Sequence, residues 1–295
     1  MKIAIVVLNY NGLTNTLECL DSLKRLEKNN YVIELIVVDN ASSDGSAEAL
    51  SKLKDISFIS SEKNLGFCGG NNLGIKRALQ RKADWILILN NDTIVDENLT
   101  NNLLKDAGNA DIISPKIYFA PGYEFHKNRY KKSELGKVIW YAGADIDWQN
   151  IIGTHTGVDE VDTGQFSKKR EITLATGAGM FIKSEVLEKI GSFNEKYFLY
   201  LEDMDFCVRA KRAGFKIVFQ PEAILWHKNA ASTGGSGSKL QDYYITRNRL
   251  LFAMKYASLR TKLALIKQII KESTNPTKRR ALLDFITGKL NKGSI

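Results

Sequence analysis

Short hydrophobic runs alternate with helical patterns through residues 3–89. The expected strands are Ile3–Leu8, Leu35–Val38, Ile56–Ile59 and Trp85–Leu89. The expected helices are Leu13–Leu26, Ser46–Leu53 and Asn71–Arg81. This alternation favours parallel strands joined by crossover helices, and helices on both faces explain why the strands are continuously apolar. The sequence therefore predicts an α/β fold with a Rossmann-like, mostly parallel sheet flanked by helices.

The pattern changes between residues 118 and 190. Tyr118–Arg170 is rich in Tyr, Lys, Gly and Trp with weak periodicity, so we assign no elements there and regard it as a candidate acceptor-facing stretch. Order returns at Leu174–Ile182. A helix should follow, with Ser184 as its N-cap.

The next segments predict a helix, a strand and a loop. The helix should begin near Leu201 and end at Gly214, because glycine suits the position that follows a helix. The strand is expected at Ile217–Phe219. Ser232–Ser238 consists of Ser, Thr and Gly, which predicts a flexible loop.

Residues 251–295 form a basic tail. They contain ten Lys and Arg against Glu272 and Asp284, and so carry +8 of the net charge of +9. Because the rest of the chain is nearly neutral, the charge does not favour nucleic-acid binding, but the tail suits an anionic membrane surface. An apolar stripe recurs at helical spacing at Leu259, Leu263, Ile266 and Ile270. The alternative is that this stripe packs on the domain, or on a second subunit of a homodimer.

The composition is that of a folded protein with a substantial core. A chain of 295 residues with 44% hydrophobic content suits one large α/β domain or two small ones. We divide residues 1–250 into halves at 1–117 and 118–250, and treat 251–295 as a helical tail. Three widely spaced cysteines favour a reducing compartment, and no run approaches the roughly 20 apolar residues of a spanning helix. We therefore expect a cytoplasmic protein, soluble or attached peripherally to the inner face of the membrane.

Polar residues follow three of the expected strands, and ligands of open α/β sheets bind beyond the carboxyl ends of strands. The three segments are Asn9–Gly12, Asp39–Ser46 and Asn90–Thr93. Asp39 can accept hydrogen bonds from a base or a ribose, and its alternative is a helix cap or Asx-turn. Asp92 can bind Mg²⁺ or Mn²⁺ through oxygen, and its alternative is a cap for the helix expected around Glu97–Leu104.

Asn64–Asn72 is a glycine-rich segment before an expected helix. Glycines let backbone N–H groups approach a phosphate at a helix start. The segment matches neither a P-loop nor a GxGxxG fingerprint. A turn with an asparagine cap explains it equally well.

Glu202, Asp203 and Asp205 place three carboxylates at an expected helix N-terminus. One or two of them can point into a cleft and take a proton from a reacting hydroxyl as a general base. The alternative is simple complementation of the helix dipole. Arg209 is spaced to pair with Asp205.

Two more residues offer ligand chemistry. His227 can bind a metal through an imidazole nitrogen, although a lone histidine is more often structural. Arg247 shares a helix face with Tyr243 and suits bidentate phosphate binding, with an exposed basic helix as the alternative.

In this order, the segments resemble the family 2 glycosyltransferases, inverting enzymes of the GT-A fold, and within them the rhamnosyltransferase-like branch. The resemblance runs from the N-terminus to about Leu251, with a gap at Tyr118–Arg170. Its motifs are Val7–Asn11, Val37–Ser42, Asn64–Asn72, Leu89–Asp92, Thr176–Met180, Tyr200–Asp203, Trp226–His227 and Tyr244–Asn248.

The resemblance implies a role for each motif residue. A nucleotide-diphosphate sugar would be bound by Asn9, Tyr10, Asp39, Asn64, Gly70, Asn71, Asn91 and Arg247. Mg²⁺ or Mn²⁺ would be bound by Asp92 and His227. Asp203 would be the catalytic base with Glu202 supporting it, and Thr176, Gly177, Ala178 and Glu202 would contact the acceptor. Asn90 replaces the first carboxylate of the family's Asp-x-Asp motif, so an easily exchanged metal is expected.

The activity implied is transfer of rhamnose or a similar hexose from a dTDP- or UDP-sugar. The acceptor would be a hydroxyl of a glycan or lipid-linked molecule in cell-surface polysaccharide synthesis, and the Ser232–Ser238 loop could close over the donor. Two alternatives are a sugar-1-phosphate nucleotidylyltransferase and a nucleotide-sugar-binding protein without catalysis. The first would need a glycine-rich, lysine-containing signature after the first strand, and Asn9–Gly12 is not one.

Overall fold

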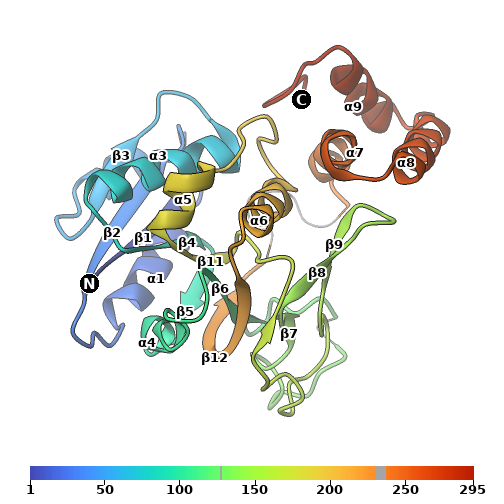
Figure 1. The fold of residues 1–295 in the computed structure, drawn as a ribbon. Helices are drawn as coiled ribbons and strands as arrows, with labels where there is room; N and C mark the ends of the chain where they lie inside the picture. The colour runs from blue at the N-terminus through green and yellow to red at the C-terminus, as the bar shows by residue number, and fades with distance from the viewer. Residues whose placement is uncertain (127, 230–236) are drawn as a thin grey trace.

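The computed structural model describes residues 1–126, 128–229 and 237–295 (Figure 1). Its strands are β1 (Lys2–Asn9), β2 (Val32–Asp39), β3 (Ser57–Ser60), β4 (Trp85–Asn90), β5 (Thr93–Val95), β6 (Ile112–Phe119), β7 (Ile139–Tyr141), β8 (Ala144–Asp147), β9 (Ile152–His155), β10 (Arg170–Glu171), β11 (Gly179–Lys183) and β12 (Ile217–His227). Its helices are α1 (Leu13–Lys24), α2 (Ser46–Ser51), α3 (Gly66–Gln80), α4 (Leu99–Leu104), α5 (Ser184–Ile190), α6 (Glu202–Arg212), α7 (Lys239–Tyr256), α8 (Leu259–Glu272) and α9 (Pro276–Ile286).

One large mixed sheet forms the centre of the molecule. Within the described residues its strand order is β10-β12-β6-β11-β4-β1-β2-β3, with β5 beside β12 and β7 beside β6. Strands β4, β1, β2 and β3 are mutually parallel, whereas β11 lies antiparallel between β4 and β6. Helices α3 and α5 lie on one side of the sheet and α1 and α4 on the other (Figure 1). The predicted α/β fold with a mostly parallel, helix-flanked sheet is confirmed.

The core is built on the hydrophobic strands that the sequence predicts. Ile3–Val7 of β1 are fully buried, as expected for a parallel strand covered on both faces. Helix α3 approaches β1 so closely that a Cβ at Gly70 would lie 2.3 Å from Leu8 Cδ1, and one at Gly74 2.3 Å from Val6 Cγ1. Glycine at these two positions is therefore required by packing.

Several predicted boundaries are corrected. Helix α3 begins at Gly66, five residues before the predicted start, because its glycines sit inside the helix against β1. Ser184 is the first residue of α5, not its cap, and its hydroxyl donates to the Ala83 carbonyl. Strand β12 continues from the predicted Ile217–Phe219 through a register shift to His227.

The second half contains the elements that the sequence did not assign. The stretch 118–170 holds β7 and the β8–β9 hairpin. Helices α7, α8 and α9 form a separate layer beside α6 (Figure 1), and α7 runs through the predicted boundary at residue 250. The tail thus forms two helices after α7 instead of one. No helix among the described residues has the length and hydropathy needed to cross a membrane.

Residues 232–236 of the predicted loop Ser232–Ser238 lie outside the described residues. Ser238 is described, and its side chain accepts a hydrogen bond of 3.2 Å from the Gln241 backbone N–H. This contact makes Ser238 the N-cap of α7.

Candidate active site

A cleft of about 590 Å³ opens beyond the carboxyl ends of β1 and β4. This is the edge at which ligands bind in open α/β sheets. The predicted site residues that line the cleft are Tyr10, Asn64, Asn91, Asp92, Thr176, Gly177, Ala178, Glu202, Asp203 and His227. The fold therefore brings into one cleft side chains from both halves of the chain.

Asp92 and His227 meet on one wall of the cleft. Asp92 follows β4 and His227 ends β12, and antiparallel pairing of β5 with β12 brings the two segments together. The His227 Nε2 lies 3.0 Å from Asp92 Oδ1 and 3.4 Å from Asn90 Nδ2. Both side chains are buried, with relative exposures of 6% for Asp92 and 4% for His227.

The donor set of this pair fits a divalent cation. A carboxylate and an imidazole are ligands that Mn²⁺ and related ions accept. The Nδ1 of His227 is buried and makes no hydrogen bond with any described residue, so its tautomer is not fixed by a partner there. No cluster of three or more His, Cys, Asp or Glu side chains suits a metal in the described part of the chain. The remaining ligands would therefore have to come from a bound substrate or water.

The indole of Trp140 packs against two imidazoles, those of His227 and His155. The Trp140 ring packs edge-on against His227, with centroids 4.6 Å apart, and also against His155 at 5.1 Å. Burial lowers the pKa of His155 to about 4, so this second imidazole is neutral near pH 7. A neutral His155 adds no positive charge beside a cation-binding wall.

Asp203 lines the same cleft, in the first turn of α6. Its Oδ1 accepts a 2.8 Å hydrogen bond from the Met204 N–H, and its Oδ2 accepts one of 3.4 Å from the Gly177 N–H. These two donors fix the carboxylate without an ion pair. Burial raises the pKa of Asp203 above its ordinary range, which brings its basicity closer to neutral pH.

Glu202 precedes Asp203 and lines the same cleft. Its side chain is 5% exposed, and Oε2 has no hydrogen-bond partner among the described residues. Burial and the adjacent Asp203 charge raise the pKa of Glu202 well above its usual range. Of the two, Asp203 is the one stabilised by backbone N–H donors and is the better anion.

The turn that aims these carboxylates is held in an unusual conformation. Phe198, Tyr200 and Leu201 all have left-handed backbones, with φ of 64°, 67° and 66°. Each such residue costs about 1–3 kcal/mol and persists only when its surroundings impose it. The turn is therefore a positioned element rather than a passive link.

Asn248 supplies much of that restraint. Its amide Nδ2 donates to the backbone carbonyls of Tyr197, Leu199 and Tyr200 at 2.9, 2.8 and 2.8 Å. The motif Tyr244–Asn248 thus acts on the turn before α6. Asn248 therefore positions Glu202 and Asp203 indirectly, through the backbone of this turn.

The position of Arg247 differs from the phosphate-binding position that the sequence predicts. Its side chain is fully buried and does not line the cleft. The guanidinium donates to the carbonyls of Tyr197 at 3.0 Å and Asn291 at 2.7 Å, and stacks over the rings of Tyr243 and Tyr244. The physical reason is that backbone carbonyls of the turn before α6 and of the segment after α9 occupy its N–H donors, which leaves the guanidinium buried between these segments.

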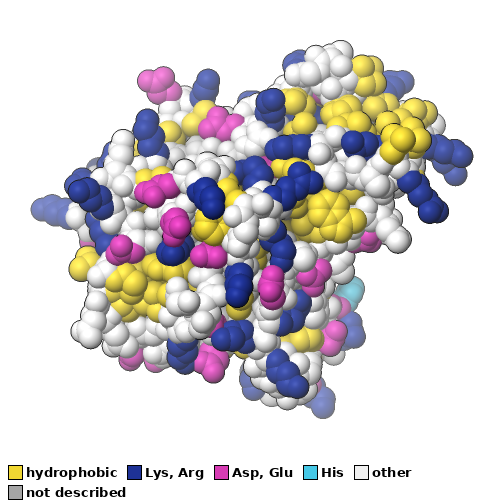
Figure 2. Space-filling model, viewed as in Figure 1, with side chains coloured by type: hydrophobic (Ala, Val, Ile, Leu, Met, Phe, Trp, Pro, Cys, Tyr) yellow, Lys and Arg dark blue, Asp and Glu magenta, His cyan; other side chains and the backbone are white. Residues whose placement is uncertain are grey.

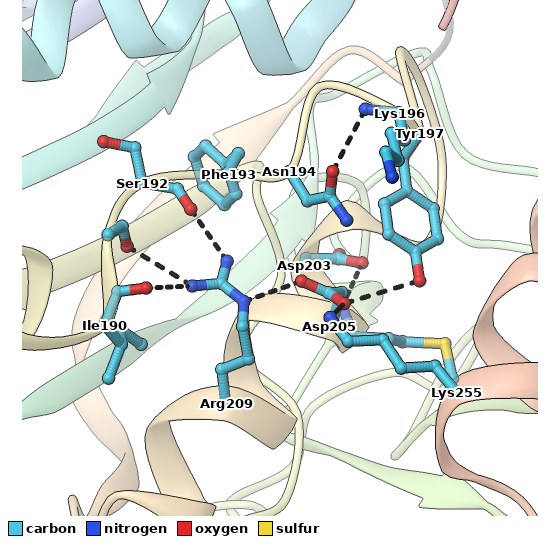
Figure 3. Close-up of polar contacts among 12 residues, drawn as sticks. Ile190, Ser192, Phe193, Asn194, Lys196, Tyr197, Asp203, Asp205, Arg209 and Lys255 are labelled. Atoms are coloured by element: carbon cyan, nitrogen blue, oxygen red, sulfur yellow. Dashed lines mark hydrogen bonds and ion pairs between the residues drawn. The ribbon is translucent and has the colours of Figure 1, made fainter. Parts of the chain in front are cut away.

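Asp205 is a structural ion-pair centre, as its spacing to Arg209 predicts. It is fully buried and pairs with Arg209 Nε at 2.7 Å and Lys255 Nζ at 3.0 Å. Figure 3 shows Arg209 on one side of Asp205, reaching the carbonyls of Ile190 and Ser192. Asp205 therefore joins α6 to α7 and to the preceding loop.

Asn9 and Asp39 form a buried pair below the cleft. The Asn9 Nδ2 donates to Asp39 Oδ1 at 2.7 Å, and the Ser42 N–H donates to Asp39 Oδ2 at 3.0 Å. Asn9 is fully buried, and its Oδ1 accepts a hydrogen bond from Thr16. The side chain therefore supports Asp39, and the direct nucleotide contact predicted for Asn9 is not available to it. Asp39 is 1% exposed, and each oxygen keeps acceptor capacity beyond these bonds.

The glycine-rich motif divides into two parts. Asn64 lines the cleft, and its Oδ1 accepts from the Gly66 N–H at 2.8 Å at the start of α3. Gly70 and Asn71 lie within α3 and away from the cleft, against the expectation for a phosphate loop. Gly70 packs on Leu8, and Asn71 donates to the Phe67 carbonyl at 2.9 Å.

The Thr176–Ala178 turn also lines the cleft. The Ala178 N–H donates to Thr176 Oγ1 at 3.3 Å, and a Cβ at Gly177 would lie 2.8 Å from the Phe67 ring. Asn91, which precedes Asp92, donates to Thr16 Oγ1 at 2.9 Å. The turn is thus shaped by a close aromatic contact.

Some cleft residues were missed by sequence reasoning. Phe125, Trp140 and His155 come from the unassigned stretch, and Tyr244 and Lys292 come from the C-terminal layer. The density of aromatic residues in Tyr118–Arg170 was the one available signal. Lys292 had none, because only tertiary folding brings residues 288–295 back to the cleft.

Solved structures and known sequences identify this architecture. The crystal structure of GalNAc-T7 with UDP, GalNAc and Mn²⁺ is similar to this chain, with a TM-score of 0.62 at 14% identity, covering 84% of this chain and 47% of the other. The chain thus spans about half the length of that structure. The mannosyltransferase PcManGT from Pyrobaculum calidifontis, in complex with GDP-Man and Mn²⁺, gives a TM-score of 0.54 at 15% identity, with cover of 99% and 76%. The fold is therefore that of the GT-A glycosyltransferases.

Sequence comparison names the family. Glycosyl transferase family 2 matches residues 4–191, and the chain belongs to this family. The low-salt glycan biosynthesis hexosyltransferase Agl10 of Haloferax volcanii is 28% identical over 253 residues, covering 84% of this chain and 74% of the relative. An N-acetylglucosaminyl-diphospho-decaprenol L-rhamnosyltransferase of Mycobacterium tuberculosis is 22% identical over 279 residues, covering 87% and 89%. The protein is a glycosyltransferase that uses a nucleotide-sugar donor.

Proposed function

We propose that the protein is an inverting hexosyltransferase that moves rhamnose or a similar hexose from a dTDP- or UDP-sugar to an acceptor hydroxyl. The acceptor is a glycan or a lipid-linked molecule in cell-surface polysaccharide synthesis. The names of the two relatives, a glycan hexosyltransferase and a rhamnosyltransferase for a diphospho-decaprenol acceptor, support this choice. The three cysteines are buried and unpaired, which fits the cytoplasmic location that we propose.

One observation carries the proposal: the Asp92–His227 pair and the Asp203 carboxylate line the same cleft. A single displacement needs a stabilised leaving group on one side of the sugar and a base on the other. A divalent cation held by Asp92 and His227 would neutralise the charge of the departing diphosphate. Asn90 in place of a carboxylate makes this site less anionic, so we propose ready exchange between Mg²⁺ and Mn²⁺.

The residues of the chain perform the rest of the reaction. Asp203 accepts the proton of the acceptor hydroxyl as that oxygen attacks the anomeric carbon. The N–H groups of Met204 and Gly177 keep its carboxylate aimed into the cleft. Glu202, Thr176 and Ala178 line the space beside it and position the acceptor. On the donor side, Tyr10 and Asn64 line the cleft and Asp39 supports the strand edge.

A thermal-shift panel of nucleotide sugars with Mn²⁺ tests the donor proposal. A ligand at about 100 times its Kd should raise Tm by about 4 °C for a chain of this size, because it binds the folded state alone. We expect dTDP- or UDP-sugars to give the largest shift and to be turned over. A shift without turnover for any donor and acceptor would favour a binding protein, and a larger shift with sugar-1-phosphate plus nucleoside triphosphate would favour a nucleotidylyltransferase.

A further inference from the structure

Helices α8 and α9 carry an apolar face that no described residue covers. On α8, Leu259, Leu263 and Ile270 are 72%, 60% and 57% exposed. On α9, Leu283 and Ile286 are 53% and 68% exposed. Figure 2 shows hydrophobic side chains gathered with Lys and Arg over this part of the molecule. We call these five side chains the α8–α9 apolar face.

Other side chains attach α8 to the protein. Leu265 and Ile269 are buried at 3% and 1% exposure and pack into the core. At about 100° per residue, they point roughly 100° away from the stripe that begins at Leu259. Of the stripe predicted from the sequence, only Ile266 is partly buried. Helix α8 therefore packs on the domain, as the alternative expected, but three of the four stripe residues take no part in that packing.

The charges around this face are almost all positive. Arg260, Lys267 and Lys271 are exposed and lie about 80–120° around α8 from Leu259, on the side away from the core. On α9, Arg279 and Arg280 are also exposed. The arrangement places an apolar stripe next to a row of cations, as in helices that lie in a membrane interface.

The two acidic residues of this region are engaged by contacts within the protein. Glu272 pairs with Lys278 at 2.8 Å. Asp284 is 6% exposed and accepts hydrogen bonds from the Tyr243 hydroxyl and from Ser294, whose Oγ lies 2.9 Å away. The outer surface of α8 and α9 therefore presents cations without competing carboxylates of its own.

We propose that the α8–α9 apolar face docks on an anionic lipid surface, with the leucine and isoleucine side chains in the headgroup region and the cations on lipid phosphates. Anionic lipid complements both features of the face. A second copy of the chain does not, because pairing this face with itself would bring like charges together. The proposal goes beyond the proposed function, since it requires neither donor nor catalysis.

Docking would also orient the cleft. Helix α7 packs against α8 and α9 and contributes Tyr244 to the cleft wall, and Lys292 follows α9 into the same wall. The cleft and the docking face thus belong to one C-terminal layer.

Vesicle co-sedimentation of the full chain tests this proposal. We expect binding to vesicles of phosphatidylcholine mixed with phosphatidylglycerol, and much weaker binding to phosphatidylcholine alone. Raising NaCl from about 0.1 M to about 1 M shortens the Debye length from about 10 Å to about 3 Å and should release the protein. The triple variant Arg260→Glu, Lys267→Glu and Lys271→Glu should bind at least about 100-fold more weakly, since each cation contributes roughly five-fold.

A matched control separates this face from net charge. Lys28→Glu, Lys63→Glu and Lys76→Glu change the net charge equally at exposed positions outside the C-terminal layer and should leave vesicle binding within about three-fold. Leu259→Ser, Leu263→Ser and Ile270→Ser should weaken binding at least about 10-fold with the Tm retained, because these side chains are exposed. The proposal would be overturned if the protein did not bind vesicles, or if the Lys28, Lys63 and Lys76 control lost as much vesicle binding as the α8 charge variant. It would also be overturned if the protein formed a dimer that the triple serine variant dissociates.

Discussion

Replacing Asp203 with Asn is expected to lower kcat for sugar transfer by about 10²- to 10⁴-fold while the Kd of the donor changes little. The amide keeps the shape of the carboxylate, and its Oδ1 can still accept from the Met204 N–H, but its NH2 group can accept neither the Gly177 N–H nor the proton of the acceptor. The measurement is steady-state transfer with Mn²⁺, together with calorimetric binding of the donor. Unchanged kcat in a variant that still binds donor would show that Asp203 is not the base.

The pH dependence gives this prediction a second readout. Burial raises the folded-state pKa of Asp203, so kcat of the wild type should fall as pH drops through that raised value, at a higher pH than for an ordinary aspartate. The folded protein then binds this proton more tightly than the unfolded chain does. The free energy of unfolding therefore decreases as pH rises from the ordinary pKa of an aspartate to the raised pKa of Asp203. Asp203→Asn removes the buried charge and should keep or raise Tm near neutral pH. Lost activity with a lower Tm would indicate misfolding instead.

Replacing Asp92 with Asn is expected to lower kcat/KM by about 100-fold or more and to raise the Mn²⁺ concentration needed for half-maximal activity. Asp92 is the carboxylate beside His227 Nε2, at 3.0 Å, in the cleft that Asp203 also lines. An amide oxygen is a weaker ligand for a divalent cation. The measurement is a Mn²⁺ titration of the transfer rate in protein first treated with EDTA.

Asp44→Asn is the control for the Asp92 substitution. Asp44 lies near the same edge of the sheet, accepts from Ser46 and Leu13, and does not line the cleft. Its substitution should leave the Mn²⁺ dependence unchanged. Identical Mn²⁺ titrations for wild type and Asp92→Asn would remove Asp92 from the metal site.

The sequence predicts the nucleotide-binding half of the fold well. Continuous hydrophobic runs such as Ile3–Leu8 and Trp85–Leu89 are typical of strands buried on both faces, and the structure has β1 and β4 there. The start of α3 was placed too late because glycines in a helix resemble a loop. Close packing of Gly70 and Gly74 against β1 is a tertiary requirement that no local pattern reveals.

The site was predictable where the chain itself placed residues at the sheet edge. Asp92 follows a recognisable strand, and Asp203 opens a recognisable helix. Arg247 was misassigned because an arginine that binds backbone carbonyls and one that binds phosphate have the same helical spacing. Trp140 and His155 come from short strands that are held by tertiary contacts and lack a periodic signal.

The amphipathic tail shows a different limit of prediction from sequence. The sequence correctly placed Leu259, Leu263 and Ile270 on one helix face, but periodicity alone could not tell a buried face from an exposed one. Burial of Leu265 and Ile269 decides the question, because these are the side chains of α8 that are buried in the core. The direction of a helix face is thus fixed by its neighbours.

The anomeric configuration of the transferred sugar tests the central claim most directly. A single displacement, with Asp203 taking the acceptor proton and the leaving diphosphate on the opposite side, inverts the configuration at the anomeric carbon. Proton NMR of the product made with the donor that the thermal-shift panel identifies should show the configuration opposite to that of the donor. A product with retained configuration would contradict the account.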